Sequence, residues 1–233
     1  MSDQPLCVIV GAGPGNGQAF ARAFAGAGFG VALLARDGPR VQALAQACGS
    51  AGFACDVREP EAVAAAFAQV RSALGDADVL VYNAGAGRFG NLDAVSADDL
   101  ESAWRTNALG CFLSVKEVLP AMRRRRRGHI VIIGATASVK GGANFIAFAS
   151  AKAALRSLAQ SLARQLGPEG IHVSHVVIDG VIDLERTRAA MPDKGDDYFL
   201  KPDDIAASVL HLARQPKSAW TFELDLRPFG ERW

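Results

Sequence analysis

An N-terminal apolar run that breaks into glycines constrains the fold of this chain more than any other stretch. Residues 6–10 are apolar and rich in β-branched side chains, which is typical of a strand buried on both faces. Four glycines follow at alternate positions: Gly11, Gly13, Gly15 and Gly17. From residue 16 apolar side chains recur at three- and four-residue spacing, which predicts a helix. Strand, glycine turn and helix together predict a turn that a pyrophosphate can approach, with a plain tight turn as the alternative.

Length and charge narrow the class of protein. A chain of 233 residues suits one large α/β domain, and a formal net charge of +1 gives no global sign of nucleic acid or an acidic membrane as partner. The polar first residues and the short run after them predict neither a signal peptide nor a membrane span. Without a Cys-x-x-Cys pair, we expect reduced thiols in a cytoplasmic protein, and neither a disulfide nor a metal site, for Cys7, Cys48, Cys55 and Cys111.

Strand and helix patterns alternate along the whole chain with short connections. We expect strands at residues 6–10, 29–35, 52–55, 79–82, 130–133, 171–178 and 221–227. Helices are predicted from residues 16, 39, 60 and 96, over 145–166, and from 202. The last strand alternates strictly, with Phe222, Leu224 and Leu226 on one face. This order predicts a single-domain, doubly wound parallel sheet of about seven strands with helices on both faces.

The helix that begins near Ser96 carries a polar residue among apolar ones. Ser96 and Asp99 have the spacing of a capping box. Steps of four, three and four residues place on one face Leu100, Trp104, Asn107 and Cys111. A buried amide needs hydrogen-bond partners, so the role of Asn107 is either structural or catalytic.

Five consecutive arginines, residues 123–127, end this helix just before Gly128. Cations at that position complement the helix dipole and the last carbonyl groups of the helix. No aromatic residues are interleaved with the arginines, so a solvated helix end is favoured over a nucleic-acid patch.

Residues 180–200 differ from the elements around them, because they are rich in charge and contain only a short helical pattern. In a doubly wound sheet, the segment that leaves the carboxyl end of a strand overlies the ligand crevice. We therefore interpret this stretch as a mobile substrate lid, with an ordinary surface loop as the alternative.

Several motifs now fall into one order along the chain. They are Gly11-x-x-x-Gly15-x-Gly17, Asp56-Val57, Asn83-Ala84-Gly85, Asn107 and Lys152. Together they resemble the short-chain dehydrogenase/reductase family over essentially the whole chain. The resemblance implies a Rossmann-like nicotinamide-binding fold in a single domain spanning residues 1–233. It also implies dimers or tetramers that assemble through the fourth and fifth helices.

The resemblance assigns cofactor contacts residue by residue. It implies that Gly11, Gly15, Asn16 and Gly17 hold the pyrophosphate, Asp56 and Val57 the adenine, and Asn83, Ala84 and Gly85 the ribose and nicotinamide side. It further implies that Lys152 reaches the cofactor ribose and that the backbone of Gly180 and Ile182 contacts the nicotinamide amide. Helix capping by Asp56 and a plain strand exit at residues 83–85 are the alternatives.

The end of the second strand indicates which cofactor is preferred. An acid there would accept the ribose hydroxyls of NAD, but the strand end is Ala35, followed by Arg36. A guanidinium suits a phosphate as a bidentate donor. Asp37 lies one residue past the strand end, so we predict NADP(H) in preference to NAD(H).

The family's catalytic pattern is broken in this chain. The resemblance implies a tyrosine four residues before Lys152 and a serine thirteen residues before that tyrosine, but these places hold Phe148 and Ala135. A phenol whose pKa is lowered by a nearby ammonium protonates the developing alkoxide, and phenylalanine has no proton to give. Losing a positioned general acid costs ~10²–10⁴ in rate. Lys152 and Asn107 remain as catalytic candidates, and Phe148 marks the altered position.

Other groups near the crevice are candidates to replace the missing hydroxyls. Thr136 and Ser138 follow Ala135 and carry hydroxyls that can orient an oxygen, with structural packing as the alternative. Asp179 and Asp183 stand where the family usually has proline and threonine, and a protonated carboxyl there would serve as an acid. The alternatives for these two are a stabilised turn and a capped lid helix.

These observations lead to one function hypothesis and one rival. We expect an NADP(H)-dependent oxidoreductase that transfers hydride to or from a carbonyl/alcohol pair and uses an atypical proton donor. Phe145 and Phe148 favour a compact, apolar small-molecule substrate. The rival is a catalytically silent NADP(H)-binding pseudoenzyme with a regulatory or structural role. For either we expect a homodimer or homotetramer and neither a nucleic-acid nor a membrane partner.

Overall fold

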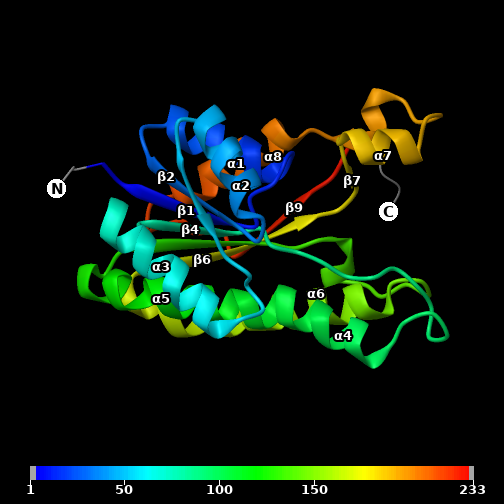
Figure 1. Cartoon of the computed structure of the whole chain (residues 1–233), viewed down its shortest axis with the longest axis horizontal. Helices are drawn as coiled ribbons and strands as arrows, with labels where there is room; N and C mark the ends of the chain where they lie inside the picture. The colour runs from blue at the N-terminus through cyan, green and yellow to red at the C-terminus, as the bar shows by residue number, and fades with distance from the viewer. Residues whose placement is uncertain (1–3, 231–233) are drawn as a thin grey trace.

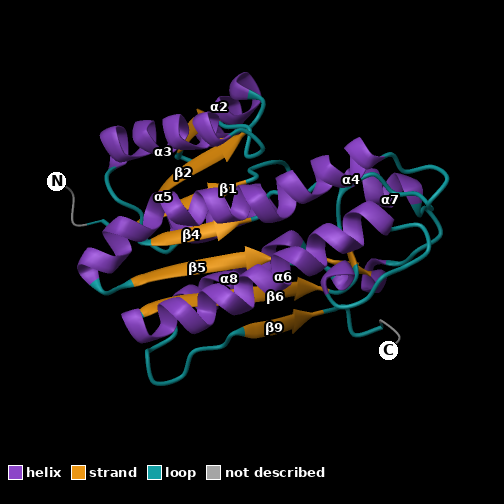
Figure 2. Cartoon of the chain, turned by 90° about the horizontal axis from the view of Figure 1, so that it is seen from below, coloured by secondary structure: helices purple, strands orange, loops and turns teal. Residues whose placement is uncertain are grey.

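Seven parallel strands form the central sheet of the computed structural model, which describes residues 4–230. The strands are β1 (Leu6–Val10), β2 (Gly30–Ala35), β3 (Ala51–Ala54), β4 (Val79–Tyr82), β5 (Gly128–Ile133), β6 (Ile171–Ile178) and β9 (Glu223–Leu226). Their order in the sheet is β3-β2-β1-β4-β5-β6-β9, and every pairing is parallel (Figure 2). The predicted doubly wound parallel sheet is confirmed.

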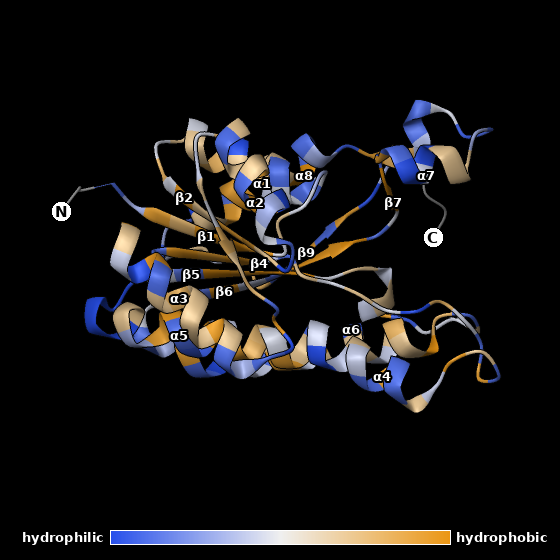
Figure 3. Ribbon diagram, in the orientation of Figure 1, coloured by the Kyte–Doolittle hydropathy of each residue, from blue (hydrophilic) through white to orange (hydrophobic). Residues whose placement is uncertain are grey.

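Helices cover both faces of the sheet (Figure 1). One face carries α1 (Asn16–Gly26), α2 (Gly38–Ala47) and α8 (Pro202–Ala213); the other carries α3 (Pro60–Leu74), α5 (Gly110–Arg125) and α6 (Ile146–Leu166). Each face of the sheet buries its own apolar cluster, so the inner strands are hydrophobic along their length. The helices instead carry both hydrophobic and hydrophilic residues (Figure 3). Within residues 4–230, no helix has the length and apolar character needed to cross a membrane.

The helix predicted from residue 96 to the arginines is interrupted. It consists of α4 (Ala97–Trp104), a π-helix at Arg105–Leu109, and α5, and the predicted capping box of Ser96 is present. The wider π turn shifts the helical register. Leu100 and Trp104 are therefore 41% and 47% exposed, whereas Asn107 and Cys111 are fully buried. The prediction that these four residues share a buried face is therefore right for Asn107 and Cys111 and wrong for Leu100 and Trp104.

Tyr82, at the end of β4, fastens the π-helix to the sheet. Its hydroxyl donates a hydrogen bond of 2.5 Å to the carbonyl oxygen of Thr106. A Cβ atom at Gly110 would lie 2.4 Å from the Tyr82 hydroxyl oxygen, so only glycine leaves room for the ring at this point. Burial raises the pKa of the Tyr82 hydroxyl well above its usual value, which keeps the donor protonated.

Strand β9 is shorter than the predicted alternation. Leu224 and Leu226 pack into the cluster beneath α1 and α8, as expected of one strand face. Phe222 packs against the opposite cluster. The prediction that all three share a face is wrong for Phe222, because the strand begins only at Glu223 and its alternation does not extend further back.

The arginine run is a charged helix end, as predicted. Arg126 ends α5 in a left-handed conformation with φ of 48°. Acids on neighbouring loops pair with the run: Arg123 with Glu169 at 2.6 Å, Arg124 with Asp76 at 3.0 Å and Arg127 with Asp78 at 3.5 Å. Arg125 also lies 3.7 Å from Asp78, so three acids pair with four arginines of the run.

Residues 180–200 form an ordered unit beyond the carboxyl end of β6. A two-stranded sheet of β7 (Val181–Ile182) and β8 (Phe199–Leu200) flanks the short helix α7 (Glu185–Ala190). Arg188 joins the unit, since its guanidinium lies 2.7 Å from both Asp183 and Asp196 and stacks 4.2 Å from the Phe199 ring centroid.

Candidate active site

The site lies between β1 and β4, where the order in which successive strands join the sheet reverses. The side-chain amide of Asn83, after β4, donates a hydrogen bond of 2.8 Å to the carbonyl oxygen of Gly11, after β1. Gly11 has φ of 87°, and a Cβ atom there would lie 2.3 Å from the backbone nitrogen of Ala84. The two strand ends therefore close on one another only because residue 11 is glycine.

A first cavity of about 630 Å³ opens at this point. The glycine turn, the start of α1 and the ends of β2 and β4 line it. It brings together Gly11, Asn16, Gly17, Arg36, Asp56, Val57, Asn83, Ala84, Gly85 and Ile182 from the sequence-predicted set. Gly15 is set back because the Leu184 side chain covers it, at 2.3 Å from the place of a Cβ atom.

The charged groups of the first cavity are arranged for an anion. Asp56 is paired with Arg58 at 2.6 Å, and hydrogen bonds from that side chain lower the pKa of the Asp56 carboxyl. Asp37 caps α2 by accepting a hydrogen bond of 3.0 Å from the backbone of Arg40, and it does not line the cavity. Arg36 and Arg40 do line it.

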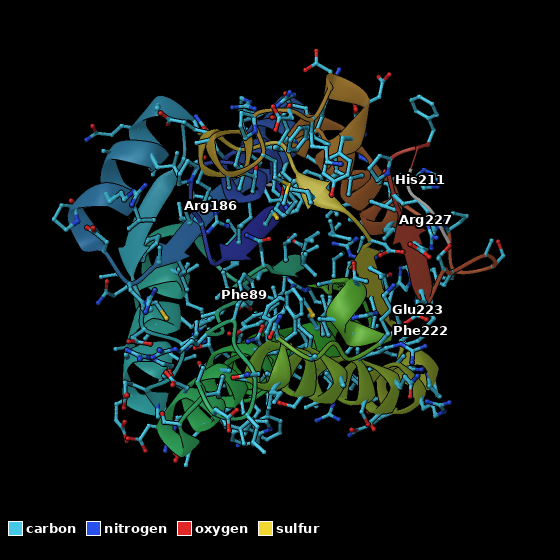
Figure 4. All side chains as sticks on the ribbon, turned by 90° about the vertical axis from the view of Figure 1, so that its right-hand side faces the viewer. Phe89, Arg186, His211, Phe222, Glu223 and Arg227 are labelled. Atoms are coloured by element: carbon cyan, nitrogen blue, oxygen red, sulfur yellow. The ribbon has the colours of Figure 1, made fainter. Side chains whose placement is uncertain are left out.

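A second cavity of about 600 Å³ adjoins the first. Figure 4 looks onto this end of the sheet. Six residues line both cavities: Asn16, Asn83, Gly85, Ala86, Ile182 and Arg186. The second cavity also contains Lys152, Phe148, Thr136 and Gly180 of the predicted set.

Lys152 and Asn107 converge beside Gly85. A Cβ atom at Gly85 would lie 3.3 Å from Lys152 Nζ and 3.4 Å from Asn107 Oδ1. Lys152 Nζ donates a hydrogen bond of 2.9 Å to the Ile133 carbonyl oxygen, and burial lowers the pKa of its ammonium to about 8. Asn107 Nδ2 donates to the carbonyl oxygen of Ala86 at 2.6 Å, while Oδ1 is buried without a partner among the described residues.

Phe148 builds an apolar wall at the tyrosine position. Its ring lies 5.6 Å from that of Phe89 and 5.9 Å from Lys152 Nζ. The Phe89 ring in turn lies 5.1 Å from Phe145. A Cβ atom at Gly87 would lie 2.9 Å from Phe148 Cβ, so glycine lets the loop approach this wall.

The two hydroxyls after Ala135 have different surroundings. Ser138 is buried and accepts a hydrogen bond of 3.1 Å from the Ala135 backbone N–H, and it does not line the cavity. Thr136 lines the cavity, and its Oγ1 donates a hydrogen bond of 2.6 Å to Asp179. Asp179 is also paired with Arg227 at 3.2 Å.

Asp183 and Tyr198, both in the 180–200 unit, lie outside both cavities. Asp183 is held by Arg188, whose hydrogen bonds lower the pKa of that carboxyl. Tyr198 packs edge-on against Phe199 at 5.3 Å between ring centroids. Neither Asp183 nor Tyr198 lines a cavity.

The cavity residues that the sequence reasoning missed include four with charged or aromatic side chains: Arg40, Phe89, Lys140 and Arg186. Arg40 stands one helical turn after Arg36, so its position was visible in the sequence. Phe89 and Lys140 lie in loops with no periodicity, and only the folded chain shows which way these loops turn.

Comparison with known proteins defines the class. A family model described as short chain dehydrogenase matches residues 6–194. The chain belongs to the short-chain dehydrogenase family.

Relatives with assigned names show the range of that family. The inactive 2-(S)-hydroxypropyl-CoM dehydrogenase 2 of Xanthobacter autotrophicus is 34% identical over 82% of this chain and 90% of its own length. The 3-oxoacyl-(acyl-carrier-protein) reductase of Escherichia coli is 31% identical over 81% of this chain and 78% of its own. An alcohol dehydrogenase of the archaeon Thermococcus sibiricus, solved with 5-hydroxy-NADP, is 30% identical with a TM-score of 0.86 and 99% of each chain covered.

Proposed function

We propose that this protein is an NADP(H)-dependent oxidoreductase that acts on a carbonyl/alcohol pair with an atypical proton donor. The observation that carries the proposal is the junction of two cavities, one at a glycine turn and one around the buried Lys152. The solved alcohol dehydrogenase named above, a family member complexed with a nicotinamide dinucleotide, supports it.

The residues present fit a nicotinamide dinucleotide. Glycine at residues 11 and 17 lets the turn pack closely on neighbouring backbone, since Cβ atoms there would lie 2.3 and 2.8 Å from backbone atoms. The buried Oδ1 atoms of Asn16 and Asn107 have no partner among the described residues. A bound nicotinamide supplies or accepts the hydride at this site. The start of α1 binds the pyrophosphate, Asp56 and Val57 contact the adenine, and Asn83, Ala84, Gly85, Lys152, Gly180 and Ile182 hold the ribose and nicotinamide.

Preference for NADP(H) follows from the pair Arg36 and Arg40. Both line the first cavity, and neither side chain has an ion-pair partner within the described residues. Two guanidinium groups suit the 2′-phosphate, whereas Asp37, the acid nearest the end of β2, caps α2 and does not line the cavity.

The catalytic part of the proposal rests on the residues around Ala135 and Phe148. Lys152 and Asn107 position the cofactor and the reacting oxygen, Thr136 contacts that oxygen, and Ser138 holds the turn that carries Thr136. Phe148 gives the substrate an apolar contact and no proton. We propose the 180–200 unit as the lid, because Ile182 and Arg186 line both cavities.

A second candidate is a pseudoenzyme that binds NADP(H) without turnover. Phe148 and Ala135 favour it, because both places at which the family carries hydroxyls are apolar here. A 34% identical relative is named as inactive, which is in line with loss of activity within this family.

We further propose a cytoplasmic homodimer or homotetramer. Leu100, Trp104 and Phe112 are 41%, 47% and 43% exposed on the outer side of α4 and α5. Exposed large apolar side chains on neighbouring helices mark a protein contact.

NADPH consumption with a panel of aldehydes, ketones, quinones and keto esters separates the two candidates. The native chain is compared with Lys152→Ala and Phe148→Tyr. Native turnover that Lys152→Ala abolishes supports the oxidoreductase with an unusual proton donor. Tight NADPH binding without native turnover, with activity only in Phe148→Tyr, supports the pseudoenzyme. Absence of NADPH and NADH binding contradicts both.

A further inference from the structure

Thr136 carries the one hydroxyl group among the described residues that line the second cavity. Its Oγ1 offers one hydrogen and two lone pairs. The hydrogen is committed to Asp179 Oδ1 at 2.6 Å, a short charge-assisted hydrogen bond. Only lone pairs of Thr136 are therefore left for a molecule in the cavity.

Asp179 is itself held by a cation on its other side. Its second oxygen lies 3.2 Å from the Arg227 guanidinium, and the side chains of Asp179 and Arg227 are 18% and 16% exposed. A carboxylate paired with a guanidinium accepts hydrogen bonds and donates none. Figure 4 shows Arg227 at the end of β9, so the edge strand of the sheet fixes the polarity of a group inside the cavity.

The surrounding chemistry gives the class of molecule. Within residues 4–230, no carboxylate lines the second cavity, and Ala135 and Phe148 contribute no O–H. The rings of Phe89, Phe145 and Phe148 form an apolar wall there. A ligand that forms a hydrogen bond with Thr136 must carry a hydrogen-bond donor. A ligand that packs against the three aromatic rings must have an apolar body.

We propose that Thr136, oriented by Asp179 and Arg227, is a hydrogen-bond acceptor that selects the hydroxyl group of an alcohol with an apolar body over the corresponding ketone. This inference rests on the proposed function and names the substrate class of that same site. Thr136 touches the substrate, whereas Asp179 and Arg227 are positioning residues. The site thereby favours the alcohol member of the pair at the position where the family presents donors.

Calorimetric titration of dead-end complexes tests this without turnover. The probes are 1-phenylethanol added to protein with NADPH, and acetophenone added to protein with NADP⁺, each up to millimolar concentration. Thr136→Val should weaken alcohol binding about three- to tenfold, the worth of one hydrogen bond, and leave ketone binding unchanged. Asp179→Asn should raise the affinity for the ketone relative to the alcohol, because the Thr136 hydrogen is then free to turn into the cavity.

Controls keep the outcome clear. Thr221→Val makes the same chemical change at the opposite end of the sheet, where the Thr221 carbonyl binds His172, and both affinities should stay as in the native chain. Thr136→Ser retains the acceptor and should restore alcohol binding. Equal effects of Thr136→Val on both probes, or binding of neither probe to a protein that binds cofactor, overturn the inference alone. Failure to bind either cofactor overturns the proposed function.

Discussion

Lys152 shows how burial changes a single side chain. Its ammonium is 4% exposed and has one hydrogen bond, to the Ile133 carbonyl oxygen. Desolvation disfavours the charged form, and the pKa falls from 10.5 to about 8. Near neutral pH the Lys152 ammonium is therefore charged in both states, and its burial in the folded state lowers the free energy of unfolding.

The pH dependence of stability should reveal this cost. Between about pH 8 and the unfolded value of 10.5, the unfolded state binds more protons at Lys152, so this contribution makes stability rise with pH. Urea unfolding at about pH 7 and pH 10 should show the native chain gaining ~1–3 kcal/mol relative to Lys152→Met. Lys116→Met, at an exposed site on α5, should show no such difference. A constant gap between native and Lys152→Met would contradict the buried charge.

Arg36 and Arg40 allow a test of cofactor choice at the same scale. Replacing both by alanine should weaken NADPH binding ~10–100-fold, because charge-assisted hydrogen bonds to the 2′-phosphate are lost, and should leave NADH binding nearly unchanged. Fluorescence titration with both reduced cofactors measures this. Arg22→Ala, which removes an exposed cation paired with Asp203 on the same face, is the matched control. Tighter binding of NADH than NADPH by the native chain would disprove the preference.

At the scale of elements, the π-helix between α4 and α5 shows where sequence reasoning reaches its limit. Strands and helices were predictable, because periodicity of apolar residues and glycine turns reports local burial. One extra residue in a helical turn leaves no local mark, so Leu100 and Trp104 were assigned to the wrong face. Asn107 lies within the π-helix itself and is fully buried, so its predicted place in the interior is right.

The hydrogen bond from Tyr82 should contribute measurably to this junction. Tyr82→Phe removes the donor to the Thr106 carbonyl inside the π-helix and should lower the free energy of unfolding by about 1 kcal/mol. Urea unfolding at constant m-value measures it. Tyr198→Phe alters the other tyrosine, whose hydroxyl has no hydrogen bond among the described residues, and should have little effect. Equal stabilities for the two variants would argue against the anchoring role.

The candidate site was predictable in part at this scale. The residues expected to hold the cofactor follow strand ends, and parallel topology brings strand ends together, so their convergence was predictable from the sequence. The hydrogen bond between Thr136 and Asp179 joins residues 43 positions apart and depends on side-chain rotamers. No spacing rule reports such a contact, and only the folded chain shows that Thr136 faces the cavity while Ser138 faces the backbone.

At the scale of the whole molecule, the amino and carboxyl ends of the sheet carry different groups. The amino end carries the paired arginine run, and the carboxyl end carries both cavities and the 180–200 unit. The outer side of α4 and α5 is left with apolar side chains in contact with solvent. A single copy therefore exposes a surface that a second copy would cover.

Light scattering should detect this association. The native chain should have the mass of a dimer or tetramer, and Trp104→Glu should shift it toward the monomer, because a charge in the proposed interface is costly to bury. Leu74→Glu, at an equally exposed leucine on α3, should leave the mass unchanged. A native chain that is monomeric at micromolar concentration would refute the assembly.

The ion pair between Asp179 and Arg227 also determines when, during synthesis of the chain, the site can be completed. The glycine turn, Lys152 and Asp179 leave the ribosome before β9, and Arg227 follows it. A nascent chain without β9 already contains the parts of the nucleotide cleft, but the guanidinium that fixes Asp179 is still missing. On the proposed function, the group that orients Thr136 is therefore completed last during synthesis, after the parts proposed to hold the cofactor.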